Sequence, residues 1–149
     1  MPIINIPGLK DATGEVPTIP AGSYLVQITR ETTKEASANS LFPGTFSMIL
    51  NAKIDGSEHE DEAGKELISF VTIPVQAAMS AVEFEEQMNL LKNLANCCEL
   101  DIESDDFNTS MFVGCTCRWI VSLGVDKKTK KPKNYVNNYM PAYTSEDDE

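Results

Sequence analysis

Hydrophobic and polar residues alternate with a period of two in two stretches of the first half of the chain, Ser23–Glu31 and Thr45–Ile54. This alternation predicts β-strands with one buried and one exposed side. A third strand is predicted over Glu66–Ile73, because the chain returns there and Pro74 ends it. In the second stretch Phe46, Met48 and Leu50 share one side, so we expect them in the core. The polar stretch Thr32–Ser40 between the first two strands is typical of a flexible loop.

A helix is predicted after the third strand. Ser80 and Glu83 stand three residues apart, which is the spacing of a capping box at a helix start. Apolar residues then recur at helical spacing and predict one buried stripe. The stripe consists of Phe84, Met88, Leu91, Leu94, Ala95 and Cys98.

Two further strands are predicted after the helix. The stretch Met111–Leu123 alternates clearly, and Trp119 lies on its more apolar side, so we expect Trp119 in the core. A lysine-rich turn, Gly124–Lys133, leads to a last strand, Asn134–Met140. The resulting order β-β-β-α-β-β predicts a mainly β, five-stranded barrel with one helix after strand three, since closure removes exposed strand edges.

The length of 149 residues fits one domain. We expect an extended leader over 1–20, because it holds four prolines, then the domain over 21–142 and an acidic tail over 143–149. Neither an apolar run long enough for a membrane helix nor a secretory signal is visible. The sequence therefore predicts a cytoplasmic protein without membrane association.

The net charge of −11 argues against nucleic acid, but the cations are unevenly distributed. Six of the 12 basic residues lie between 118 and 133, so a local cationic patch can exist on an acidic protein. Such a patch can bind phosphates, although a solvated turn kept soluble by lysines is the simpler interpretation. The candidate phosphate ligands are Lys53, Arg118, Lys127, Lys128, Lys130, Lys131 and Lys133.

Aromatic residues near these cations are candidates for stacking on nucleobases. Tyr135 and Tyr139 alternate with Val136 beside lysines and asparagines, and Phe42 lies in the predicted loop. The alternative is that both tyrosines are ordinary structural residues of a strand.

Catalytic and metal-binding patterns are absent from the sequence. The cysteines Cys97, Cys98, Cys115 and Cys117 lack zinc-site spacing, so we expect buried reduced thiols. His59, the single histidine, lies among acids, and we expect it in a solvated loop. No nucleophile–histidine pair, phosphate loop or dinucleotide motif is present. We therefore expect a non-enzymatic protein without cofactor or metal.

Four segments together resemble small phage-type single-stranded DNA-binding proteins with an oligonucleotide-binding (OB) fold. They are Pro20-Ala21-Gly22-Ser23-Tyr24, the stretch from Asn39 to Leu50, Val113-Gly114-Cys115, and Asn134-Tyr135-Val136-Asn137-Asn138-Tyr139-Met140-Pro141. The resemblance covers about residues 18–142. It implies an OB barrel that binds and protects single-stranded DNA, without sequence preference, in phage replication or recombination in the host cytoplasm.

The resemblance also implies a role for the acidic residues Glu146, Asp147, Asp148 and Glu149. They would compete for the basic groove or recruit replication or recombination proteins, although the hydrophobic tip common in that family is missing. A solubility tail is the simpler interpretation. The net charge also favours a different class, an acidic protein-interaction module that imitates DNA to inhibit a DNA-binding enzyme. The sequence leaves open whether the protein is a monomer or a homo-oligomer.

Overall fold

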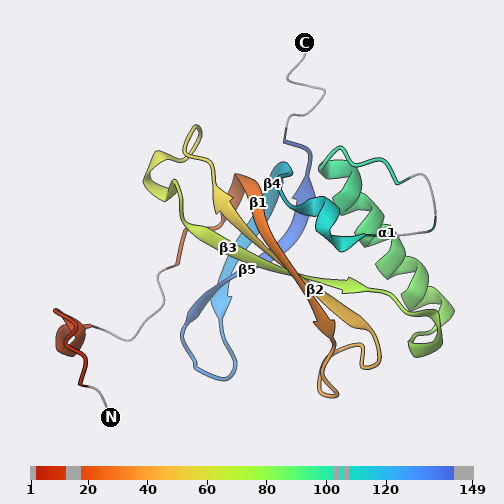
Figure 1. Cartoon of the computed structure of the whole chain (residues 1–149), viewed down its shortest axis with the longest axis horizontal. Helices are drawn as coiled ribbons and strands as arrows, with labels where there is room; N and C mark the ends of the chain where they lie inside the picture. The colour runs from red at the N-terminus through yellow and green to blue at the C-terminus, as the bar shows by residue number, and fades with distance from the viewer. Residues whose placement is uncertain (1–2, 13–17, 103–104, 106–107, 143–149) are drawn as a thin grey trace.

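The computed structural model describes residues 3–12, 18–102, 105 and 108–142. Its main element is one antiparallel sheet of five strands in the order β3-β2-β1-β4-β5, accompanied by one α-helix, α1 (Figure 1). The elements are β1 (Gly22–Glu35), β2 (Phe46–Ile54), β3 (Glu66–Ile73), α1 (Ala81–Cys97), β4 (Thr116–Val125) and β5 (Pro132–Met140).

Strand β1 is long and bent, and it joins the two halves of the sheet. Its first part, from Gly22 to Gln27, pairs with β4, and its last part, from Arg30 to Glu35, pairs only with β2. The pairing with β2 shifts by one residue between Ile28 and Arg30, and such a bulge bends a strand and increases its twist. As a result β1, β2 and β3 lie in front of β4 and β5 in Figure 1.

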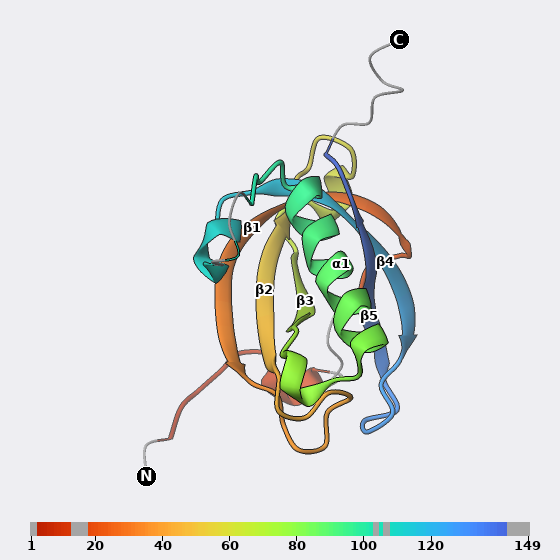
Figure 2. The same cartoon turned by 90° about the vertical axis from the view of Figure 1, so that its right-hand side faces the viewer.

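The edge strands β3 and β5 approach each other without forming a ladder. The sheet is therefore open, and the closed barrel predicted from the sequence is not formed by backbone pairing. A side-chain hydrogen bond between Ser69 Oγ and Tyr139 Oη crosses the gap. Helix α1 lies over this gap and contacts both edge strands (Figure 2).

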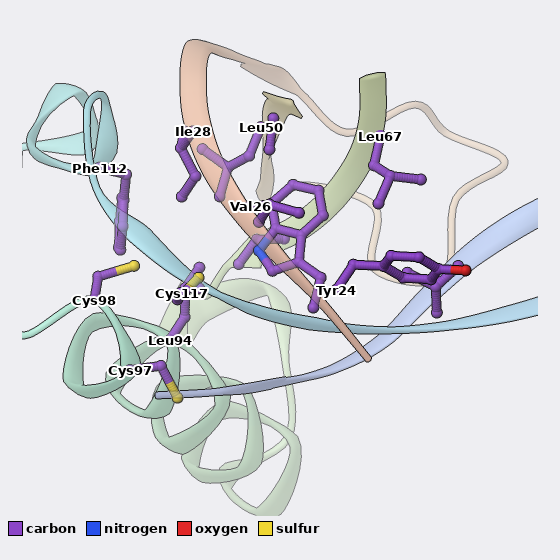
Figure 3. Close-up of a cluster of buried hydrophobic side chains, with 14 of the residues drawn as sticks. Tyr24, Val26, Ile28, Leu50, Leu67, Leu94, Cys97, Cys98, Phe112 and Cys117 are labelled. Carbon is purple, nitrogen blue, oxygen red and sulfur yellow. The ribbon is translucent and has the colours of Figure 1, made fainter. Parts of the chain in front are cut away.

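The core fills the space between the curved sheet and α1. Trp119, Phe112, Ile28, Met48 and Leu50 are fully buried, which confirms the predictions for Trp119, Met48 and Leu50. Figure 3 shows residues from β1, β2, β3, β4 and α1 meeting in this cluster. Burying a large apolar side chain contributes roughly 1.5–3 kcal/mol, so this cluster holds the sheet and the helix together.

The predicted helix is confirmed together with its cap. The Ser80 hydroxyl accepts a hydrogen bond from the Glu83 backbone N–H, and the Glu83 carboxylate accepts one from the Ser80 N–H. Leu91, Leu94 and Ala95 are buried as expected. Met88 was expected in the buried stripe but is 47 % exposed, because it lies at the margin of that stripe.

Several predicted boundaries are wrong. Residues Thr109–Phe112 form a 3₁₀ helix, and Gly114 has a left-handed φ of 91°, so β4 begins at Thr116 and not at Met111. The predicted loop from Thr32 is strand up to Glu35, because β2 pairs along its whole length with β1. The lysine-rich turn is also shorter than predicted, since β4 continues to Val125 and β5 begins at Pro132.

Candidate nucleic-acid interface

The register of β1, β2 and β3 defines a surface on the side of the sheet away from the core. Met48, Leu50 and Ala52 are completely buried, so their neighbours on β2 point outward. Residues directly opposite in paired strands share a side. The outer face, as we call it, therefore consists of Gln27, Arg30, Thr32, Lys34, Ser47, Ile49, Asn51, Lys53, Glu66, Ile68, Phe70 and Thr72.

The centre of the outer face is apolar and exposed. Phe70 lies opposite Ile49, and Ile68 lies opposite Asn51. The exposed fractions are 63 % for Phe70 and 46 % for Ile68. The outward side of a sheet is usually polar, and a phenylalanine with an open ring can stack on a planar ligand.

Cations flank this apolar centre on the β1 side and at one end of β2. Arg30 lies opposite Asn51 and Lys34 opposite Ser47, while Lys53 lies on β2 opposite Glu66. Within the described ranges, Arg30, Lys34 and Lys53 form no ion pair. The Glu66 carboxylate accepts a hydrogen bond of 2.8 Å from Asn51 Nδ2. The outer face therefore combines an open aromatic ring with free positive charge.

The turn between β4 and β5 is well ordered and presents lysines to solvent. Asp126 organises it, because its carboxylate accepts from the N–H groups of Lys128 at 2.8 Å and Thr129 at 3.2 Å. These backbone donors lower the pKa of Asp126. Lys130 adopts a left-handed φ of 63° and donates its N–H to the Asp126 carbonyl. The side chains of Lys127, Lys128, Lys130 and Lys131 are exposed.

Of the two tyrosines predicted to stack, Tyr135 has an accessible ring. It lies opposite Ser122 and is 37 % exposed. The Lys133 ammonium lies 5.4 Å from its ring centroid and 3.6 Å from an Asp126 carboxylate oxygen. Lys133 is therefore already engaged by neighbours of the same hairpin.

Tyr139 is placed in the packing of the protein and not on its surface. Its ring packs edge-on against Trp119 with centroids 6.2 Å apart, and its hydroxyl bonds Ser69. Burial raises its pKa to about 12. Tyr139 therefore fits the alternative of an ordinary structural residue. It lies on the same strand as Tyr135 but in a different environment.

Arg118 is committed to contacts within the protein. Its guanidinium forms a bidentate ion pair with Glu58 at 2.6 and 2.5 Å, and its Nε donates to the Ala142 carbonyl at 2.9 Å. The Arg118 hydrogen bonds lower the pKa of Glu58. Arg118 thus ties the β2–β3 loop to the end of β5, and its predicted role as a phosphate ligand would require breaking this pair.

Two phenylalanines, Phe42 and Phe46, lie in and beside the β1–β2 loop. Phe42, a predicted stacking residue, is half-buried, and its carbonyl accepts from the Thr45 hydroxyl at 2.6 Å. Phe46 was expected in the core but is 41 % exposed, because β1 and β2 extend beyond the core at this end.

His59 and the cysteines have structural environments. His59 is not a solvated loop residue: its ring lies 4.5 Å from that of Tyr24, and its Nε2 lies 3.0 Å from the Ser23 carbonyl oxygen. The cysteines are free thiols, as expected, and burial raises the pKa of Cys97 and Cys115. Among the described residues no group of His, Cys, Asp or Glu is arranged to hold a metal ion.

The acidic tail residues Glu146, Asp147, Asp148 and Glu149 lie outside the described residues. Their starting point, Ala142, lies at the opposite end of β5 from the lysine turn (Figure 1). The nine residues of β5 span about 30 Å. The acids follow Ala142 by four to seven residues, which reach about 14–25 Å when extended. The structure thus gives little support to contact between tail and turn in one copy.

Comparisons with known proteins leave the family undetermined. Neither the protein-family models nor the curated proteins that were searched give a match to this chain. In the described part of the chain, no helix has the length and apolarity needed to cross a membrane.

Phe70, the most exposed aromatic residue in the described part of the chain, was not predicted from the sequence as a site residue, and neither were Arg30 and Lys34. One signal was available, because both sides of the alternation in Glu66–Ile73 are apolar. A strand with one buried side should carry polar residues on the other. Lys34 was overlooked because the strand was predicted to end at Glu31, which left Lys34 in a loop. Arg30 lay inside the predicted strand, but its place opposite Asn51 follows from a bulge that the sequence did not indicate.

Proposed function

We propose that this protein binds single-stranded DNA on the outer face of β1, β2 and β3. The observation that carries the proposal is the exposed Phe70 ring among Arg30, Lys34 and Lys53 on a chain with a net charge of −11. An acidic protein has no need of an apolar, cation-rimmed sheet face for solubility. A polyanion with planar, apolar bases has the complementary chemistry.

Each part of the outer face has a role in this proposal. Phe70 stacks on one base, and the neighbouring Ile68 and Ile49 contact the apolar faces of adjacent bases. Arg30, Lys34 and Lys53 pair with phosphates. Stacking and phosphate pairing carry little sequence information, so binding is expected to depend weakly on sequence.

The lysine turn and Tyr135 extend this site in the proposal. Lys127, Lys128 and Lys130 are exposed cations on a hairpin whose turn is closed by backbone hydrogen bonds. Tyr135 offers a second accessible ring. OB-fold proteins bind oligonucleotides on the face of strands two and three and with the loops between strands one and two and strands four and five.

An OB-type barrel is part of the same proposal. A long, bent first strand that pairs with both β2 and β4 supports it, as do a helix between β3 and β4 and the side-chain contact of β3 with β5. The biological setting inferred is protection of exposed strands during DNA replication or recombination, with the acidic tail recruiting partner proteins.

Titration of a fluorescent oligo-dT at low and high salt tests the proposal. We expect binding to the single strand that exceeds binding to a duplex of equal length and weakens with salt. The slope of the logarithm of the binding constant against the logarithm of the salt concentration becomes more negative by roughly 0.7 for each phosphate contact. Absence of single-strand binding at low salt would reject the proposal and favour the acidic protein-interaction module.

A further inference from the structure

The N-terminal arm, residues 3–12, carries apolar side chains that nothing in the described chain covers. Ile3 is 100 % exposed and Ile4 73 %, and Ile6 and Leu9 are exposed as well. The backbone hydrogen bonds of the arm join only its own residues, such as Leu9 N–H to the Ile6 carbonyl at 3.1 Å. Figure 1 shows the arm standing away from the sheet.

A hollow beside the β1–β2 loop is more apolar than polar and is uncovered within the described part of the chain. Its lining includes Ala36, Ala38, Pro43 and Phe46, with Glu35 as its charged residue. The exposed Phe46 ring forms part of this lining, and the neighbouring Leu41 is 85 % exposed. The hollow is therefore a receptor of suitable chemistry for a short aliphatic segment.

We propose that the arm of one copy of this chain docks into the hollow of a second copy. The arm supplies isoleucines and Lys10 for a hollow that supplies alanines, proline, an open phenylalanine ring and Glu35. Aliphatic side chains thus meet an apolar lining, and the arm cation can meet the carboxylate of the hollow.

The positions of the two features argue for a second copy as the occupant. In Figure 1 the arm lies at the left of the molecule, whereas the β1–β2 loop lies at its lower end, right of centre, so the two are separated within one copy. Two different complementary surfaces on one chain make a head-to-tail contact, which can repeat from copy to copy. The association would therefore grow beyond a dimer as the protein concentration rises.

This inference is independent of DNA binding. Its residues lie outside the outer face, and its test contains no nucleic acid. A failure of the association would leave the proposed function untouched, and a failure of DNA binding would leave the association untouched.

Sedimentation velocity of the full chain tests the association from about 1 to 200 µM, because small interfaces bind weakly. We expect the weight-average sedimentation coefficient to rise with concentration. The double variant Ile4→Ser, Ile6→Ser should weaken association at least about tenfold, since it removes the apolar contacts of the arm. The matched control is Val82→Ser on α1, which changes a residue that is 65 % exposed elsewhere.

A complementation experiment identifies the two sides of the contact. Ala38→Glu places a charge in the hollow but leaves the arm intact. Alone, it should stay monomeric; mixed with the arm variant, it should form 1:1 dimers that do not extend, because only one arm and one hollow remain. Ala36→Glu serves in its place if that variant does not fold.

Three results would overturn the proposal. The first is a wild-type chain that remains monomeric over the whole concentration range. This result would include a chain whose arm docks into the hollow of the same copy. The second is an arm variant that associates like the wild type. The third is a control, Val82→Ser, that loses association to the same extent as the arm variant.

Discussion

Single residues of the same type have different roles in this protein because their strands place them on different sides of the sheet. Phe70 and Phe46 lie on neighbouring strands, but Phe70 points outward from the centre of β3 and Phe46 lines a hollow at the end of β2. Tyr135 is accessible, whereas Tyr139 is packed against Trp119. Roles at this scale depend on side and depth, and not on residue type.

Replacement of Phe70 by alanine should weaken single-stranded DNA binding. Loss of one stacking platform costs roughly 1–3 kcal/mol, which corresponds to about a 5- to 150-fold rise in Kd. Fluorescence anisotropy with oligo-dT at nanomolar protein measures the change. Phe46→Ala is the matched control, because it removes an exposed ring from the other side of the same strand pair, and it should bind as the wild type does. Equal affinity of Phe70→Ala and wild type would remove Phe70 from the site.

Replacement of Tyr139 by phenylalanine should affect stability and not DNA binding. The change leaves Ser69, which is 2 % exposed, without its partner, and an unpaired buried polar group costs about 1–3 kcal/mol. Urea unfolding at pH 7 measures the loss. A change in DNA affinity larger than that of Tyr135→Ala would contradict this assignment.

The pKa of Tyr139 also gives a dependence on alkaline pH. The pKa is raised from 10.0 to about 12 in the folded protein, so the folded state keeps the phenol proton where the unfolded state loses it. The stabilising contribution is complete below pH 10 and decreases as the pH rises toward 12. Between these values wild type should lose stability more steeply than Tyr139→Phe in urea unfolding. If the free energies of unfolding of the two proteins fall equally with pH between these values, Tyr139 does not titrate this way.

At the scale of elements, connections between neighbouring segments determine which cations are available. Arg118 ties the β2–β3 loop to the end of β5 through Glu58 and Ala142. The lysine turn instead bonds its own backbone through Asp126 and leaves the lysine side chains exposed. The sheet face offers Arg30 and Lys34 because β1 continues as a strand to Glu35.

The ion pair of Arg118 with Glu58 should contribute to stability in a pH-dependent way. Arg118 lowers the pKa of Glu58, so the contribution is present above the ordinary glutamate pKa and is lost as pH falls through the lowered value. Because the Glu58 side chain is 39 % exposed, we expect about 1 kcal/mol or less. The difference in urea unfolding between wild type and Arg118→Gln should shrink as the pH falls, down to the part that the Arg118–Ala142 hydrogen bond contributes. A difference that does not change with pH would assign the whole effect to that bond and to packing of the arginine.

The salt dependence of binding distinguishes the sheet face from the lysine turn. Arg30→Gln with Lys34→Gln should reduce the log–log slope by about 1.4 if both cations contact phosphates. Lys127→Ala with Lys128→Ala and Lys130→Ala should reduce it by about 2 if the turn takes part. Arg118→Gln is the control, since its charge is already paired, and it should leave the slope unchanged. An unaltered slope in either set would exclude that set from phosphate binding.

At the scale of the whole molecule, the acidic tail begins at the end of β5 that is far from the lysine turn. Contact within one copy would require the tail to run almost fully extended back along the strand. We therefore expect neutralisation of Glu146, Asp147, Asp148 and Glu149 to change oligo-dT affinity by no more than about twofold at 0.15 M salt, where charges are screened beyond about 8 Å. A larger gain in affinity at nanomolar protein would establish competition by the tail within one copy.

The sequence by itself determined the type and order of the elements. Alternation, together with the turn residues and prolines that bound the strands, predicted five strands, and the capping box with its apolar stripe predicted α1, because these signals are local. It also predicted the burial of Trp119, Met48 and Leu50, since they occupy the apolar side of an alternation.

Only the tertiary structure decided which side chains are available for binding. Which side of a strand faces solvent at a given residue depends on register, bulges and the extent of the core, and these arise from contacts distant in sequence. Phe70 became a candidate because β3 pairs with β2 at a free outer face, and Tyr139 ceased to be one because it reaches across to Ser69 on β3. The Arg118 guanidinium is likewise occupied by an ion pair with Glu58, 60 residues away in sequence, and no local pattern could indicate this pairing.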